Sequence, residues 1–325
     1  MQRPQTSSKN WRFTDVTIRG EEVLVDHPLL GAHMSTSGGV HTAFARGTSI
    51  GCTTMQVFVK NNNRWNAPRL NEQEIQSYKT EEANVAIAPV VAHAAYLINL
   101  CAVNASVLNN SRRAFVDELH RCEAFGIKAL VFHPGAHMGT GEKEGIKRIA
   151  ESLNVIHQQS ESCRVLSTLE STAGQGTTVG YRFEHLQSII NLVEQKDRMA
   201  ICLDTCHLYA SGYDIGSAEG WNDCIGEFND VVGLDRLVAI HVNDSKRELG
   251  SRVDRHEHIG KGRIDLRGFA AMMNDARLTG IPKILETPKS EDMHEDGENM
   301  RVLRSLVERK KPYLPARAIS KSKAR

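Results

Sequence analysis

The sequence predicts a single α/β domain in which eight β-strands, and the helices between them, close into a barrel. Short apolar runs recur along the chain, and segments of helical period separate most of them. The apolar runs are PLLGAH (28–33), TTMQVFV (53–59), AIAPVVAH (86–93), ALVFHPG (129–135), VLSTLES (165–171), AICLD (200–204), LVAIHVND (237–244) and PKILET (282–287). Most are rich in Val, Ile or Leu, which is typical of parallel strands buried on both faces.

Segments with apolar residues at helical spacing follow the later runs. They are 111–126, 145–159, 183–195, 224–233, 268–275 and 299–310. A (β/α)8 TIM barrel is the compact arrangement of such alternating units, and a doubly wound open sheet is the alternative. We place the barrel domain at residues 25–310, between a polar N-terminal extension (1–24) that we expect to be loose and a basic C-terminal tail (311–325).

Composition narrows the class of protein. The formal net charge is +1, so any contact with DNA or RNA must come from a local patch. No apolar run reaches the roughly 20 residues of a membrane span, and the polar N-terminus lacks a secretory signal. The seven cysteines include no CxxC pair, which argues against a disulfide framework. We expect an intracellular protein, cytoplasmic in a bacterium, or nuclear if it is eukaryotic and the tail is a targeting signal.

Six of the predicted strands end in, or carry near their ends, a histidine or a carboxylate. In a barrel, the carboxyl ends of the strands meet at one mouth, where active-site groups gather. The residues are His93, His133, Glu170, Asp204, His241 and Glu286, with His207 shortly after Asp204. Buried carboxylates and imidazoles at this density are costly unless positive charge neutralises them, and bound metal ions would do that.

A further pair, Asp254 and His256, lies in SRVDRHEHIG and shares one face of an extended loop. It brings the candidate ligands to five His, two Asp and two Glu, all nitrogen or oxygen donors that suit zinc, manganese or iron. Two or three ions with a bridging carboxylate fit this set. Metal ions about 3.5–4 Å apart are a recurring arrangement for phosphodiester hydrolysis.

The stretch CLDTCHLY leaves other interpretations open. Cys206 and His207 could form a nucleophile pair, or these residues could be polar groups at a strand end without any chemistry. On an extended strand Cys206 would share a face with Asp204, so its position does not exclude a ligand role. A packed, apolar thiol is the simpler interpretation of Cys206, and Cys202 fits the core.

Loops at the same mouth carry residues suited to a polyanion. The sequence KNNNRW follows the second strand, Tyr96 follows the third, and a basic loop surrounds the Asp254/His256 pair. An ordinary polar loop is the alternative for KNNNRW, and His33 could either orient a ligand or contact phosphate. The candidates for phosphate, groove or stacking contacts with nucleic acid are Lys60, Asn61, Asn63, Arg64, Trp65, Tyr96, Lys246 and Arg255.

These residues lie in motifs that resemble the endonuclease IV family, the zinc-dependent apurinic/apyrimidinic endonucleases. The motifs are LLGAHMSTSGG, AHAAYLINL, FHPGAH, LESTAGQG, CLDTCHLYASGYD, HVNDSK, GSRVDRHEHIGKG and ILET, and the resemblance runs from about residue 28 to about 310. It implies a TIM barrel with three zinc ions per chain, although manganese or iron could occupy one site. The implied ligand sets are His93, His133 and Glu170; Glu170, Asp204, His241 and Glu286; and His207, Asp254 and His256.

The resemblance also implies a function. The family cuts duplex DNA on the 5′ side of an abasic site, leaves a 3′ hydroxyl, and removes blocking groups from 3′ ends. Glu170 would bridge two metal ions, and Glu286 would also orient or deprotonate the attacking water. The loops at Lys60–Trp65 and Tyr96 would enter kinked DNA with the abasic nucleotide flipped out. We expect a monomer.

The sequence departs from relatives in three loops. The segment CAVNASV follows AYLINL where a Gly and a Pro are more frequent, the basic residue of KNNNRW stands at Arg64 rather than at Asn63, and Ser171 replaces a frequent Asn. Two rival functions are a metal-dependent sugar isomerase or epimerase on the same barrel, and a non-catalytic binder of damaged DNA with structural zinc. The number of metal ions per chain would distinguish the sugar isomerase or epimerase from the nuclease. Turnover of DNA would distinguish the non-catalytic binder from it.

Overall fold

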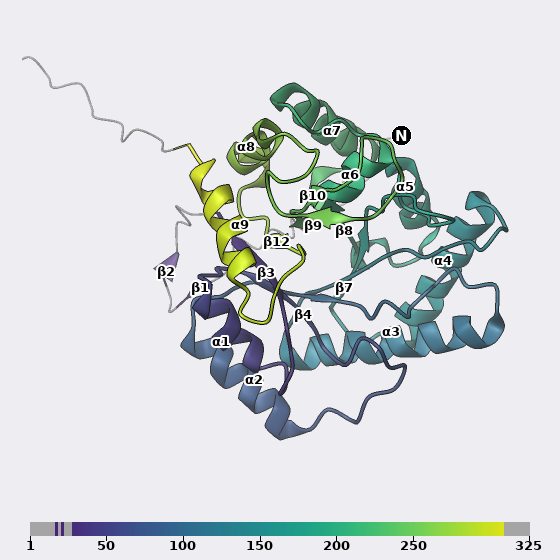
Figure 1. The fold of residues 1–325 in the computed structure, drawn as a ribbon. Helices are drawn as coiled ribbons and strands as arrows, with labels where there is room; N and C mark the ends of the chain where they lie inside the picture. Colours follow the sequence, from purple (N-terminus) through teal and green to yellow (C-terminus); the bar gives the residue numbers. More distant parts are fainter. Residues whose placement is uncertain (1–16, 19–20, 23–27, 309–325) are drawn as a thin grey trace, which may run out of the picture.

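A computed structural model of the protein describes residues 17–18, 21–22 and 28–308. Eight parallel strands close a barrel in the order β12-β3-β4-β5-β6-β7-β8-β9, which confirms the predicted TIM barrel (Figure 1). Each strand overlaps one of the apolar runs. The strands are β3 (Leu30–Met34), β4 (Met55–Phe58), β5 (Val90–His93), β6 (Ala129–Phe132), β7 (Leu166–Glu170), β8 (Met199–Asp204), β9 (Leu237–His241) and β12 (Lys283–Leu285).

The main helices pack around the outside of the barrel (Figure 1). They are α1 (Thr42–Ser49), α2 (Glu72–Asn84), α3 (Ala105–Phe125), α4 (Glu142–Gln159), α5 (Phe183–Leu192), α6 (Thr205–Ser211), α7 (Ala218–Val231), α8 (Leu266–Asn274) and α9 (His294–Ser305), with 3-10 turns η2 (Lys196–Arg198), η3 (Leu234–Arg236) and η4 (Ala276–Leu278). The six predicted helical segments correspond to α3, α4, α5, α7, α8 and α9.

Helices α1, α2 and α6 were not among the predicted segments. The apolar pattern of α2 is weak, because a single residue of this helix, Tyr78, is fully buried and one position cannot show a helical period. Its start is set instead by a capping box: Asn71 Oδ1 accepts the Glu74 N–H at 2.9 Å, and Glu74 Oε2 accepts the Asn71 N–H at 3.0 Å. Local polar chemistry therefore defines this helix more than hydrophobic periodicity does.

Alternation along the strands divides the apolar side chains into two clusters. One fills the barrel interior and comprises Val91, Ala129, Val131, Leu166, Ala200, Cys202, Val238, Ala239 and Ile284. The larger cluster includes Leu30, Phe115 and Leu153 and packs the strands against the helices. Along a strand, every second side chain points to the same face of the sheet. The residues that stand two positions after Val91, Val131, Cys202 and Ile284 therefore also face inward, at the mouth of the barrel.

Two short antiparallel pairs lie outside the barrel sheet. Strand β10 (Asp244–Ser245) pairs with β11 (His256–Glu257), so a hairpin-like loop carries His256 back toward the mouth. Strand β1 (Thr17–Ile18) pairs with β2 (Glu21–Glu22). This pair lies within the polar N-terminal extension (1–24). The rest of the extension and the basic tail (311–325) lie outside the described residues.

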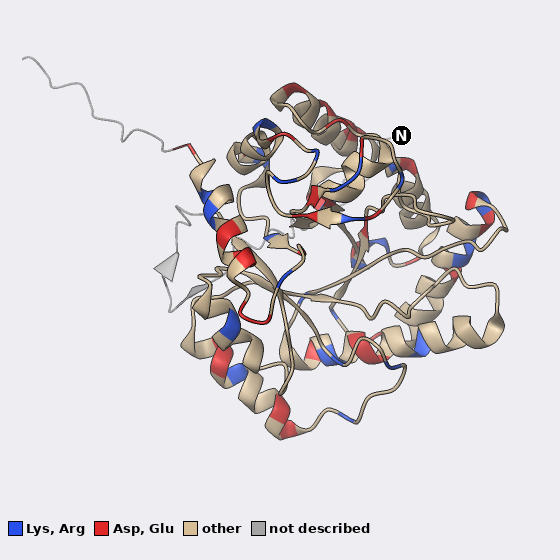
Figure 2. Ribbon diagram, in the orientation of Figure 1, with Lys and Arg blue, Asp and Glu red and all other residues tan. Residues whose placement is uncertain are grey.

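The outer helices carry charges of both signs, with Lys and Arg interspersed among Asp and Glu (Figure 2). This distribution agrees with the near-zero net charge of the sequence, which is +1. Among the helices of residues 28–308, none combines the length and the apolarity needed to cross a membrane.

Candidate metal centre

The strand register brings the predicted ligands together at one end of the barrel. Six of them end a strand or follow it directly: His93, His133, Glu170, Asp204, His241 and Glu286. His207 lies in α6, which continues directly from β8, and Asp254 and His256 lie in the loop that ends at β11. The nine candidate residues fall into three groups that each bring ligand atoms within 4.8 Å of one another.

The first group consists of His93, His133 and Glu170. The Nε2 atoms of both imidazoles lie 3.2 Å from Glu170 Oε2. His93 and Glu170 are buried, whereas the side chain of His133 is 36% exposed. This group therefore opens toward solvent on the His133 side.

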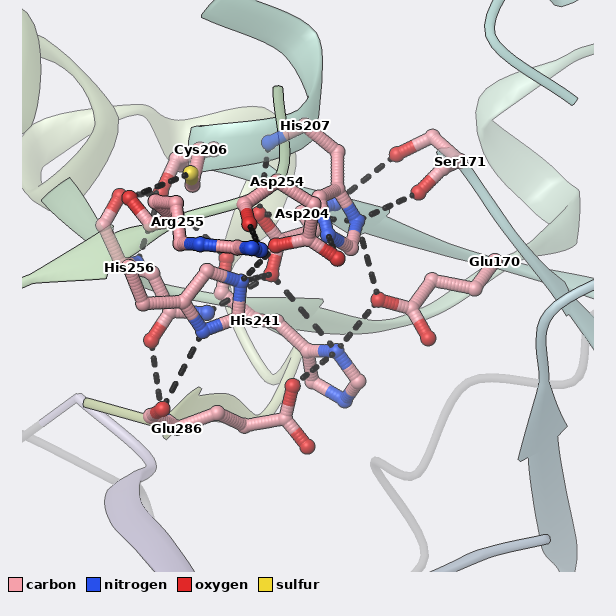
Figure 3. Close-up of polar contacts among 12 residues, drawn as sticks. Glu170, Ser171, Asp204, Cys206, His207, His241, Asp254, Arg255, His256 and Glu286 are labelled. Atoms are coloured by element: carbon pink, nitrogen blue, oxygen red, sulfur yellow. Dashed lines mark hydrogen bonds and ion pairs between the residues drawn. The ribbon is translucent and has the colours of Figure 1, made fainter. Parts of the chain in front are cut away.

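The second group shares Glu170 and adds Asp204, His241 and Glu286 (Figure 3). His241 Nδ1 lies 3.0 Å from Glu170 Oε1 and 3.1 Å from Glu286 Oε2. Glu170 thus directs Oε2 to the first group and Oε1 to the second. A carboxylate in this position has the geometry needed to bridge two cations.

The third group consists of His207, Asp254 and His256 (Figure 3). His207 Nε2 lies 3.1 Å from Asp254 Oδ2, and His256 Nε2 lies 3.3 Å from Asp254 Oδ1. Asp204 caps α6 by accepting the His207 N–H at 2.8 Å, which fixes the start of this helix beside the second group. Gln175 Oε1 accepts the Asp254 N–H at 2.8 Å and so ties the loop after β7 to the third group.

Three of the imidazoles are oriented by backbone carbonyls. The Nδ1 atoms of His93, His207 and His256 lie 2.7, 2.8 and 3.1 Å from the carbonyl oxygens of Ala94, Ser171 and Glu286. A carbonyl only accepts, so each Nδ1 carries the proton, and in the neutral ring Nε2 holds a lone pair. Histidines that bind metals commonly donate their second nitrogen in this way.

The donor atoms fit a metal centre. The Nε2 atoms of His207 and His256 are buried and face the Asp254 carboxylate at 3.1 and 3.3 Å, yet within residues 28–308 neither makes a well-directed hydrogen bond. Two ligands at about 2.0–2.2 Å from one tetrahedral zinc ion lie about 3.3–3.6 Å apart, and the closest ligand separations in the three groups are 3.0–3.3 Å. Nitrogen and oxygen donors are the ligands of catalytic zinc sites, in which cysteine is less common.

The electrostatics of the centre favour positive charge. Burial alone would raise the pKa of Glu170, but the imidazoles of His241 and His133 hold it well below its usual range. Burial opposes protonation of His207, yet Asp204 and Asp254 raise its pKa well above the ordinary value. The Asp254 pKa falls to about 2 because His207 outweighs the effect of burial. Protons on the imidazoles or divalent cations can both supply the charge that these carboxylates need.

The sequence did not predict that three polar residues, Gln56, Ser171 and Asn243, contact the candidate ligands; Ser171 was noted only as a departure from relatives. Ser171 Oγ accepts the Asp204 N–H at 2.9 Å, and Asn243 Nδ2 donates to Asp204 Oδ2 at 2.7 Å. Gln56 is buried on β4 and contacts both His241 and Glu286. A polar side chain within an apolar run could have indicated two of these contacts. Gln56 occupies an inward-facing position of its strand, and Asn243 comes just after its strand.

Cys206 is packed rather than reactive. Its side chain is buried, its thiol donates to the Arg255 carbonyl at an Sγ to O distance of 3.7 Å, and burial raises its pKa to about 12. A nucleophilic cysteine needs a lowered pKa, so the geometry does not support a Cys206–His207 nucleophile pair. The thiol does lie within ligand distance of Asp204 and His256. Cys202 belongs to the barrel interior, as expected.

The structure separates Lys60 from the other candidate DNA contacts. Its Nζ is buried and lies 3.3 Å from Glu118 Oε1 and 3.1 Å from the Trp65 carbonyl oxygen. We therefore correct the expectation that Lys60 contacts phosphate: it anchors its own loop to α3. Most of the remaining candidates are exposed on loops, namely Asn61, Asn63, Arg64, Tyr96, Lys246 and Arg255, whereas Trp65 packs partly against the core.

Tyr96 lies above the first group. Its side chain is 62% exposed, and its ring contacts those of Phe58 and His93, with centroid distances of 5.4 and 5.5 Å. One face of the ring is therefore supported by the barrel mouth. The exposed remainder is available to another planar group or a sugar.

Known proteins share this fold and much of this sequence. The family model described as xylose isomerase-like TIM barrel matches residues 44–306. A Chloroflexus aurantiacus protein named probable endonuclease 4 is 47% identical over 281 residues, which cover 86% of this chain and 99% of that protein. The crystal structure of endonuclease IV from Thermus thermophilus aligns with a TM-score of 0.75 and 32% identity, over 86% of this chain and 98% of that one. This protein belongs to the endonuclease IV family.

The membership agrees with the resemblance seen in the sequence motifs. A D-tagatose 3-epimerase-like protein also aligns, with a TM-score of 0.66 at 14% identity, over 85% of this chain and 96% of that one. That likeness shows a shared barrel and nothing about activity. The shared barrel fold therefore does not separate the endonuclease IV family from such proteins, whereas sequence identity does.

Proposed function

We propose that this protein is a zinc-dependent endonuclease of DNA repair that hydrolyses the phosphodiester 5′ to an abasic site in duplex DNA. The products would be a 3′ hydroxyl and a 5′ deoxyribose phosphate, and the same site would remove blocking groups from 3′ ends. The observation that carries the proposal is the joining of three nitrogen- and oxygen-donor groups around the shared carboxylate Glu170 and the neighbouring Asp204. Membership in the endonuclease IV family supports it.

The residues of each group would hold one metal ion, which gives three zinc ions per chain with Glu170 bridging two of them. Bound zinc would supply Lewis-acid activation of water and neutralise negative charge on the phosphate oxygens. Glu286 has one carboxylate oxygen toward His241 and the other toward His33 and Gln56, at the edge of the mouth. We infer that it orients the attacking water and receives its proton.

A cavity of about 620 Å³ adjoins Glu286, and its lining includes His33, Ser35, Phe58, Tyr96 and Lys289. Its position beside the candidate ligands suits a nucleotide that has left the helical stack. An abasic nucleotide costs less to flip than a paired one, because no base has to be unstacked or unpaired. We propose that this cavity receives the abasic sugar and its phosphate.

The exposed loops around the mouth would hold the duplex. Arg64, Lys246 and Arg255 supply positive charge for backbone phosphates, and Asn61 and Asn63 supply amide donors. Trp65 and Tyr96 supply aromatic surface beside the lesion. We expect the protein to act as a monomer, since all three metal groups come from one chain.

The test is incision of a labelled duplex that carries one tetrahydrofuran abasic analogue. This analogue cannot undergo β-elimination, so a cut must be hydrolytic. A single cut 5′ to the analogue with an extendable 3′ hydroxyl, and an intact lesion-free duplex, is the expected result. Binding of zinc and DNA without any cut would favour the damage-binding rival, and turnover of a ketose sugar without DNA cleavage would favour the isomerase.

A further inference from the structure

Gln56 connects two members of the second ligand group, His241 and Glu286, through its side-chain amide. It lies on β4, its side chain is fully buried, and it points into the barrel interior toward the mouth. Gln56 Oε1 lies 2.8 Å from His241 Nε2, and Gln56 Nε2 lies 2.6 Å from Glu286 Oε1. The same amide nitrogen lies 3.0 Å from His33 Nδ1. One buried amide therefore contacts three polar side chains that surround the candidate metal centre.

The chemistry of Glu286 and His241 fixes the direction of the hydrogen bonds that Gln56 makes with them. An ionised carboxylate only accepts, so the end of the Gln56 amide that faces Glu286 must be the NH₂ group. The carbonyl end then faces His241 Nε2, which must carry a proton in order to donate. In the neutral imidazole the lone pair is consequently on Nδ1. His241 Nδ1 is the atom that faces Glu170 Oε1 at 3.0 Å and Glu286 Oε2 at 3.1 Å.

His241 differs in this respect from three other candidate ligands. His93, His207 and His256 donate Nδ1–H to backbone carbonyls and present Nε2 to the centre. His241 presents Nδ1 to the centre instead. Its other ring nitrogen, Nε2, bonds the side-chain amide of Gln56 and not a backbone carbonyl. The Gln56 amide, on β4, is separated from His241 on β9 by β3 and β12 in the barrel order. It can do what a carbonyl does for the other rings, and it can also donate to a carboxylate.

We propose that Gln56 is a positioning residue that holds His241 in its Nε2–H tautomer and holds Glu286 with Oε2 toward the centre. It thereby prepares the second ligand group for a divalent cation. The inference rests on the proposed metal-dependent function and deepens it. Gln56 itself does not contact the ion, because both ends of its amide are occupied by His241 and Glu286. Outer partners of this kind typically contribute 10- to 100-fold to metal affinity.

The experiment compares Gln56→Met with the wild-type chain. Methionine has a similar length and no strong hydrogen-bonding group, so it removes both bonds while filling most of the space. Gln56→Ala serves as a second variant in case Met cannot be accommodated. Thr54→Val is the matched control, because Thr54 is buried close to Gln56 along the chain and its Oγ1 bonds the Pro89 carbonyl at 2.6 Å, away from the ligands.

Each full-length protein is stripped with a chelator, reloaded with zinc, and titrated with a competing chelator while zinc per chain is measured. The expected result is a 10- to 100-fold loss of affinity at one site of Gln56→Met and Gln56→Ala, with the other sites unchanged. Thr54→Val should match wild type. Excess zinc should restore incision of the abasic duplex by Gln56→Met, with an unchanged KM for DNA.

Two results would overturn the inference: wild-type zinc affinity at every site in both Gln56 variants, or an equal loss in Thr54→Val. A KM for DNA that rises while zinc affinity stays constant would also contradict it, because Gln56 would then act on the substrate. If wild type binds zinc but does not cut the abasic duplex, the proposed function fails. The zinc titrations still decide the role of Gln56 in that case.

Discussion

The buried pair Lys60–Glu118 predicts a specific dependence of stability on pH. Glu118 lies on α3, is 1% exposed, and accepts the Ala95 N–H at 3.1 Å. Burial raises its pKa from 4.5 to about 7, although Lys60 opposes this shift. The folded state therefore keeps the proton of Glu118 at pH values where the unfolded chain has lost it. The resulting stabilisation is fully present below about pH 4.5 and is lost as pH rises through about 7.

The magnitude follows from the shift. At 1.36 kcal/mol per pH unit, the change from 4.5 to about 7 corresponds to about 3 kcal/mol, of which about 2.5 kcal/mol falls between pH 5 and pH 8. Glu118→Gln removes the titration and keeps an acceptor for Ala95. Relative to wild type, the unfolding free energy of Glu118→Gln should therefore rise by about 2.5 kcal/mol over this range.

The assay is urea unfolding of wild type and Glu118→Gln at several pH values, each protein saturated with zinc so that other groups cancel in the difference. Lys60→Met provides a second arm: without the ammonium group the pKa of Glu118 should rise further, and the pH window should move upward. A difference between wild type and Glu118→Gln that stays constant from pH 5 to pH 8 would refute the reasoning.

Three further predictions concern the site and its loops. Glu170→Ala should lose metal from two groups and lower incision by about a thousandfold, measured by zinc content and single-turnover rate; full zinc and full activity would contradict its bridging position. Tyr96→Ala should weaken binding to abasic duplex by about 1–3 kcal/mol without changing zinc content, and unchanged affinity would exclude a stacking role. Asp244→Ala should lower the unfolding free energy by about 3 kcal/mol, because Asp244 accepts backbone N–H groups of Gly260, Gly262 and Ile264 at 2.9 Å. An unfolding midpoint equal to that of wild type would disprove this.

The sequence predicts those parts of the fold and the site that depend on a pattern of neighbouring residues. Buried parallel strands are short apolar runs, and a His or a carboxylate at the end of such a run must lie at the barrel mouth. The sequence alone therefore predicts that His93, Glu170 and His241 lie together. The same reasoning failed for Lys60, because a lysine in a polar loop looks exposed until the packing of α3 brings Glu118 beneath it.

Other features depend on contacts between distant parts of the chain. Gln56 lies 185 residues before His241 and 230 before Glu286, so nothing near it in the sequence indicates its partners. The carbonyls that orient His207 and His256 belong to Ser171 and Glu286, and backbone groups have no sequence signature. Helix α6 was not among the predicted helices, since its apolar pattern is too short to show a helical period and its cap is Asp204 itself.

The most direct test of a metal-dependent abasic endonuclease is zinc titration of chelator-stripped protein, with incision of the tetrahydrofuran duplex measured at each step. We predict that the stripped protein does not cut, and that incision 5′ to the analogue reaches its maximum at three zinc ions per chain. Cutting by the metal-free protein, saturation at one zinc ion per chain, or no cutting at full metal loading would contradict it.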